Sequence, residues 1–240
     1  MFNKPFRLTL LFFALAVTKI LAQGAVDSTG YATNTQGAID IYSSGIGEQS
    51  EIYNGEIYNI RPVATKGSPY FLDAAFTVPG MIRYNGTLYK NVPLLYDIFA
   101  NQMVAAQRNV FFVLRADKLS DAYFSGHHFI NLVNQTGKLS PGYYDELYEG
   151  RSQVLVKRAR EVKRLAATQT VEVSYFNSDV IYIRKAGAYF EVDGKGSVLS
   201  LFKDKKKELN QFLKDKGVRY GDNREASIVL LANYYDQLTK

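Results

Sequence analysis

The feature that most constrains the fold of this chain is a series of short strand-like runs separated by turn residues. Asn54-Gly55 and Asn85-Gly86 each lie between two short runs that alternate apolar and polar residues. Asn-Gly accepts the positive φ angles of a two-residue hairpin turn. The sequence therefore predicts a β-hairpin at each dipeptide.

Further runs continue this pattern at intervals of about 8 to 12 residues, as in an antiparallel meander. They cover residues 94–99, 102–106, 110–115, 118–124, 128–133, 153–158, 171–176, 180–184 and 189–192. The 18 Tyr and 15 Phe also favour strands. Residues 143–149 are expected to form one helical turn or a tight connection, and 158–167 suit either a helix or a strand.

The pattern changes to helical periodicity near the C-terminus. Asp204 is expected to cap a helix over about 204–216. Asp222 and Glu225, spaced as in a capping box, are expected to open a second helix over about 223–238. We therefore predict one α+β domain over 51–240, a mostly antiparallel β meander with a C-terminal helical hairpin packed on its second half. The pattern leaves a curved sheet, a barrel and a sandwich open.

The N-terminal region predicts export. Lys4 and Arg7 precede an apolar run over 8–17, and a small residue at Ala22 offers a cleavage point, so residues 1–22 are predicted to form a signal peptide. The run has about half the length that a membrane-spanning helix needs, so the chain is not expected to span a membrane. Residues 23–50 are expected to form a loosely ordered arm, and the protein is expected in the periplasm or at the cell surface. The chain contains no cysteine, which excludes disulfides and thiol chemistry.

Three parts of the chain carry a resemblance to known sequences. They are Tyr89–Asp97, Gly142–Gly150, and Leu201–Leu213 together with Glu225-Ala226 and Tyr234–Asp236. Across roughly 67–240 the chain resembles uncharacterised exported proteins of Bacteroidota bacteria. The resemblance implies a compartment and a lineage, and it implies no activity, cofactor or site residue.

Basic residues concentrate in one stretch that is a candidate partner surface. It contains Arg151, Lys157, Arg158, Arg160, Lys163 and Arg164. In an exported protein such a stretch favours an anionic envelope component or a protein partner over nucleic acid, with a plain solvated face as the default alternative. In addition, Asp27-Ser28-Thr29 resembles the O-glycosylation site of exported Bacteroidota proteins, which makes Ser28 a candidate acceptor.

No motif for catalysis, metal or cofactor binding emerges from the sequence. His127 and His128 are the only histidines, and because neighbours on a strand point to opposite faces they are not expected to share one ion. The acidic candidates to compare with them are Asp97, Asp117, Asp121, Asp145 and Glu146. We predict a non-catalytic binding or structural module, with a hydrolase acting on envelope glycans or lipids as the alternative. Carboxylates converging on either histidine would favour the enzyme.

Overall fold

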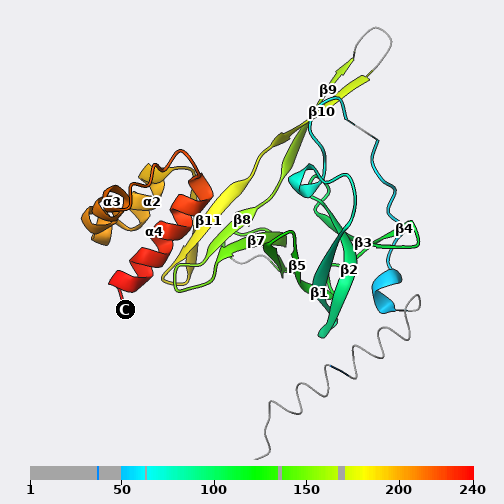
Figure 1. Cartoon of the computed structure of the whole chain (residues 1–240), viewed down its shortest axis with the longest axis horizontal. Coiled ribbons are helices and arrows are strands. Elements are labelled where there is room, and N and C mark those ends of the chain that lie inside the picture. Colours follow the sequence, from blue (N-terminus) through cyan, green and yellow to red (C-terminus); the bar gives the residue numbers. More distant parts are fainter. Residues whose placement is uncertain (1–36, 38–49, 63, 135–136, 167–170) are drawn as a thin grey trace, which may run out of the picture. The chain divides into compact units, whose positions relative to one another are not determined.

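A computed structural model describes residues 37, 50–62, 64–134, 137–166 and 171–240 (Figure 1). The predicted signal peptide over 1–22, Ser28 and nearly all of the predicted arm over 23–50 lie outside these residues. Within the described residues, every helix is too short or too polar to cross a membrane.

The described residues form one 10-stranded sheet, in the order β12-β11-β8-β7-β6-β5-β1-β2-β3-β4, in which neighbouring strands are antiparallel. The strands are β1 (Val78–Tyr84), β2 (Thr87–Asp97), β3 (Gln102–Gln107), β4 (Val110–Val113), β5 (Leu119–Phe124), β6 (His127–Leu132), β7 (Gly142–Tyr148), β8 (Val154–Lys157), β11 (Val180–Lys185) and β12 (Ala188–Val192). The α+β prediction is confirmed. Of the three alternatives, the open curved sheet fits, because the order runs between two different edge strands.

Only one of the two Asn-Gly dipeptides forms the predicted hairpin. Asn85 and Gly86, with φ of 51° and 78°, connect β1 to β2. The hairpin at Asn54-Gly55 is wrong, because a 3₁₀ helix, η2 (Glu51–Tyr53), precedes it and the following residues lie beside β4. A Cβ at Gly55 would stand 1.9 Å from the carbonyl oxygen of Val113, so this glycine permits a close approach of two backbones instead of a turn.

The described parts of both segments, 143–149 and 158–167, contain strands. The expected helical turn at 143–149 is wrong, since β7 occupies it and pairs with both β6 and β8. The second segment contains β9 (Arg160–Ala166), which pairs with β10 (Val171–Asn177) in a separate two-stranded ribbon. The ribbon continues the β8–β11 pairing beyond an interruption at 158–159 and 178–179, which we call the strand break. There the backbone N–H of Ala159 donates to Asp179 Oδ1 at 3.0 Å.

Three α-helices follow the last strand in the described chain, one more than predicted. They are α2 (Lys195–Leu201), α3 (Lys206–Asp215) and α4 (Arg224–Leu238), with a 3₁₀ turn, η4 (Lys203–Lys205), before α3. Both predicted caps are wrong. Asp204 forms an ion pair with Lys185 at 2.8 Å instead of capping α3, and the side chain of Asn223, not Asp222, accepts from the N–H of Ala226 to cap α4.

The two largest of the hydrophobic clusters in the described residues hold most of these elements together. In one, helical residues such as Leu209, Ile228 and Leu231 pack on Val156 and Ile183 of β8 and β11, which confirms the predicted docking of the helices on the second half of the sheet (Figure 1). The other cluster is rich in aromatic residues and fills the space over β1, β2, β5 and β6. Its buried aromatic residues are Phe71, Tyr84, Tyr96, Phe124, Phe129 and Tyr143. Phe71 comes from η3 (Phe71–Asp73), the 3₁₀ turn that precedes β1.

Candidate functional site

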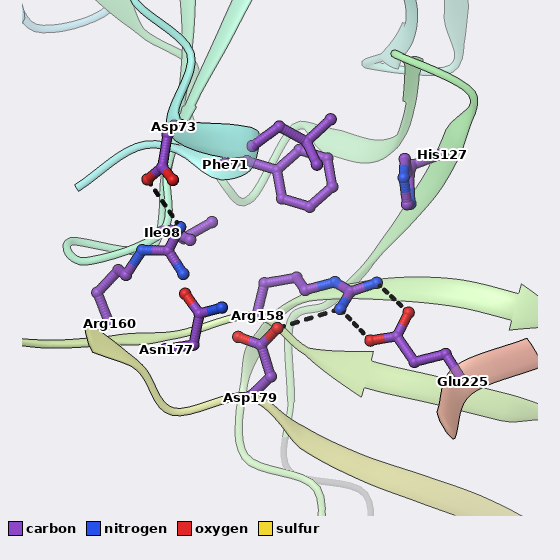
Figure 2. Close-up of a pocket in the computed structure, with 10 residues that line it drawn as sticks. Phe71, Asp73, Ile98, His127, Arg158, Arg160, Asn177, Asp179 and Glu225 are labelled. Carbon is purple, nitrogen blue, oxygen red and sulfur yellow. Dashed lines mark hydrogen bonds and ion pairs between the residues drawn. The ribbon is translucent and has the colours of Figure 1, made fainter. Parts of the chain in front are cut away.

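A pocket of about 460 Å³ lies where η3, β6, the strand break and the start of α4 come together (Figure 2). Its apolar residues are Phe71, Leu72 and Ile98, and its polar residues are Asp73, His127, Arg158, Arg160, Asn177, Asp179 and Glu225. The volume falls in the range of about 300–1,000 Å³ that is usual for small-molecule sites. We take this pocket as the candidate functional site.

Arg158 is the centre of the pocket's charge network. Its side chain is 8% exposed, and it donates to Asp145 from Nε at 2.9 Å and from Nη2 at 2.5 Å. Glu225 Oε1 and Oε2 accept from Nη1 and Nη2 at 2.5 and 2.9 Å, and Asp179 Oδ2 accepts from Nη1 at 3.1 Å. All five N–H groups of the guanidinium therefore have acceptors.

The network keeps Arg158 charged and joins three parts of the fold. Burial by itself would lower the pKa of Arg158, but hydrogen bonds and charges from Glu225 and Asp145 outweigh it and raise the pKa above its ordinary value. Asp145 belongs to β7, Asp179 lies at the strand break, and Glu225 lies in the first turn of α4.

His127 reaches the same network from β6. Its Nδ1 lies 2.8 Å from Asp145 Oδ2, and its ring meets the ring of Phe71 edge-on, with centroids 4.8 Å apart. Because a carboxylate accepts hydrogen bonds, we assign the proton of neutral His127 to Nδ1, which leaves Nε2 as an acceptor. His128 repeats the pairing outside the pocket, with Nδ1 2.8 Å from Glu146 and its ring stacked on Tyr123.

Arg160 and the loop residues Leu72 and Asp73 form the opposite side of the pocket. The side chain of Arg160 is 7% exposed, and it donates from Nε to the carbonyl of Ser68 at 3.0 Å and from Nη2 to Asp73 Oδ1 at 3.2 Å. Leu72 and Asp73 have φ of 55° and 51°, a conformation that costs an L-residue roughly 1–2 kcal/mol. The loop holds the exposed side chain of Leu72 at the pocket.

The structure distributes the six predicted basic residues over different environments. Arg151 donates to the carbonyls of Asp236 and Thr239 at the end of α4, and Lys157 donates to the carbonyl of Pro141 and lies over the ring of Tyr144. Arg158 and Arg160 line the pocket. Lys163 and Arg164 are exposed, with Lys163 Nζ 5.2 Å from the ring centroid of Phe176 on the paired strand β10, and as neighbours on β9 they point to opposite faces of the ribbon.

Several residues of the pocket could not be singled out from the sequence. Asp145 was an acidic candidate and does contact His127, whereas Asp97 and Asp121 pair with Arg61 and Arg83 elsewhere. Asn177, Asp179 and Glu225 carry no local signal, because they meet Arg158 and Arg160 only through strand pairing and helix docking. Asn177 pairs with Arg160 across β9 and β10, so the register of these two strands would have placed the two residues side by side. The sequence does not give that register.

Chemically, the pocket combines a fixed charge network with a histidine that presents one ring nitrogen and with polar groups on its far side. This arrangement can bind a polar molecule, and it contains a histidine–carboxylate pair of the kind that orients a general base. Comparisons of the chain with protein families, curated proteins and solved structures find no match.

Proposed function

We propose that this chain is an exported cell-envelope protein of the uncharacterised Bacteroidota group that it resembles, and that it is a non-catalytic binding module. Its pocket at the strand break binds a small polar ligand. The observation that carries this proposal is the contrast between the two sides of the pocket. Arg158 has acceptors for every N–H group, whereas the described residues provide no hydrogen-bond partner for Arg160 Nη1 or for the side-chain amide of Asn177.

The state of the pocket carboxylates supports binding over catalysis. Both oxygens of Glu225 accept from Arg158, and the two oxygens of Asp179 accept from Ala159 and Arg158. A general acid or base must exchange a proton with the substrate, and a carboxylate held by a buried guanidinium is constrained in position and in charge. No serine, threonine, cysteine or tyrosine is among the residues that line the pocket in the described chain.

One contact favours the alternative, a hydrolase acting on envelope glycans or lipids. Asp145 holds His127 by Nδ1, the geometry in which Nε2 could take a proton from water. The carboxylates do converge near His127, as expected for an enzyme. A turnover of chromogenic glycosides or esters that disappears in His127→Gln, with the fold intact by circular dichroism, would replace the binding proposal with this one.

The binding proposal can be tested with NMR on the chain without residues 1–22. The probes are neutral sugars, amines, carboxylates and phosphate monoesters, each at millimolar concentration. We expect at least one class to shift the side-chain amide signals of Asn177 and the ring signals of His127. Asn177→Phe should fill the pocket and abolish the shifts of the His127 ring signals.

A matched control lies on the same strand. Ser174→Phe places the same ring on β10 at a residue that does not line the pocket, and it should leave the shifts unchanged. Shifts that survive in Asn177→Phe, or no shift with any probe class, would contradict the proposal. Export is tested separately, because a mature N-terminus just after Ala22 in the envelope fraction supports it, and an intact Met1 species in the cytoplasm contradicts it.

A further inference from the structure

We propose that the ligand of this pocket is an uncharged sugar unit, an inference that rests on the proposed binding function and names its ligand class. The formal charge around the pocket is negative. Asp73, Asp179 and Glu225 line it together with two arginines, and Asp145 lies directly against Arg158. Four carboxylates against two guanidinium groups leave a formal charge of −2 with His127 neutral. An anionic ligand therefore meets net repulsion, although two arginines line the site.

The hydrogen-bonding capacity of the pocket favours a ligand rich in donors. The donors without a partner in the described chain are Arg160 Nη1 and the amide nitrogen of Asn177. The acceptors are more numerous. Besides the amide oxygen of Asn177 and Nε2 of His127, the carboxylates of Asp73, Asp179 and Glu225 keep lone pairs beyond those that the arginines use. Hydroxyl groups, which both donate and accept, fit this mixture.

The apolar residues of the pocket lie among its polar residues. Figure 2 shows Phe71 next to Arg158, whose guanidinium carbon lies 5.7 Å from the ring centroid, and Ile98 beside Asp73 and Arg160. Leu72, whose side chain is exposed, adds apolar surface at the rim. A sugar ring has a C–H face and a periphery of hydroxyls, so it can contact the exposed side chain of Leu72 and the polar residues of the pocket at once. A simple ammonium or polyamine would satisfy the charge but leave the donors of Arg160 and Asn177 unpaired.

The test compares two ligands that differ in one group, methyl glucoside and methyl glucuronide, by NMR titration of the chain without residues 1–22. The glucuronide carries a carboxylate in place of the hydroxymethyl group. We expect the glucoside to bind at least about tenfold more tightly. Glucosamine, which is cationic, should bind at least as well as the glucoside.

Asp73→Asn tests the electrostatic origin of this preference. The side chain of Asp73 is 62% exposed, so the substitution removes one negative charge beside Arg160 with little disturbance of the fold. It should reduce the preference for the glucoside severalfold, chiefly by tightening glucuronide binding. Glu161→Gln is the matched control, because it makes the same charge change on β9 at a residue that does not line the pocket, and it should leave the preference unchanged.

The outcomes separate this inference from the function on which it rests. Tighter binding of the glucuronide, or binding of amines or phosphates without either glycoside, overturns the ligand class and leaves the binding function standing. A preference that Asp73→Asn and Glu161→Gln reduce equally overturns the electrostatic argument. No binding of any probe class overturns both.

Discussion

The strand break and the ribbon beyond it carry basic residues only a few positions apart, yet they use them differently. Arg158 at the strand break and Arg160, the first residue of β9 next to it, have side chains that are 8% and 7% exposed, with carboxylate or carbonyl acceptors around them. On the ribbon Lys163 and Arg164 are exposed. The difference shows that the surroundings supplied by β7, η3 and α4, and not the density of charge along the chain, decide which cations become part of the interior.

Arg158→Met should have the largest effect, because it leaves Asp145, Asp179 and Glu225 without their shared counter-charge. We expect a loss of about 3–5 kcal/mol in the free energy of unfolding, measured by urea denaturation. Arg158→Lys should recover only part of it, since an ammonium has three donors and lacks the planar geometry of a guanidinium. A loss below about 1 kcal/mol would mean that Arg158 contributes no more to stability than the exposed basic residues of the ribbon.

Arg160→Met should cost less, about 1–2 kcal/mol, because its partners are the backbone carbonyls of Ser68 and Tyr70 and the exposed Asp73. Arg164→Met, four residues along the same strand, is the matched control and should change the unfolding free energy by less than about 0.5 kcal/mol. Equal losses in the two variants would mean that the buried Arg160 contributes no more to stability than the exposed Arg164.

Replacing Lys157 should change the free energy of unfolding by a smaller amount, and this change should depend on pH. Burial lowers the pKa of Lys157 below its ordinary value of 10.5. Between the lowered pKa and 10.5 the unfolded chain binds more protons than the folded one, so folding stability rises with pH in that window. Lys157→Met should therefore be as stable as the wild type or more stable at pH 7, by less than about 1 kcal/mol, and should lose this advantage as the pH approaches 10.5. Unfolding curves measured from pH 7 to 11 provide the test, and an advantage that grows with pH would contradict it.

The ribbon should give the smallest effect on stability. Lys163→Glu with Arg164→Glu should change the unfolding free energy by less than about 0.5 kcal/mol. These two residues are exposed and, unlike the exposed Arg151, do not contact the end of α4, so the double variant should lose retention on an anionic dextran sulfate column at low salt. Arg151→Glu is a poor comparison because Arg151 binds the end of α4. Unchanged retention would dispose of the ribbon as an anion-binding surface.

The elements that could be predicted are those specified by residues that lie close together in the sequence. Asn85-Gly86 specifies a hairpin within a few residues, and the apolar stripe of α4 repeats along one segment. The same dipeptide at Asn54-Gly55 fails because the backbone of Val113, which is distant in sequence, approaches that glycine. Asp204 fails as a cap for a similar reason, since Lys185 from β11 provides a stronger partner than the free N–H groups of α3.

The sequence by itself determined the class of the fold, the short antiparallel strands and the position of the helices at the C-terminal end, because alternation, turn chemistry and helical periodicity act over a few residues. The tertiary structure alone decided that Asp145, Asp179 and Glu225 meet at Arg158, since these residues come from β7, the strand break and α4. A buried charge persists only where acceptors surround it, and long-range strand pairing and helix docking supply those acceptors. A single sequence shows which residues are charged but not how far apart they lie in the fold. The basic stretch was therefore predicted to be a surface, whereas its residues Arg158 and Arg160 line a pocket.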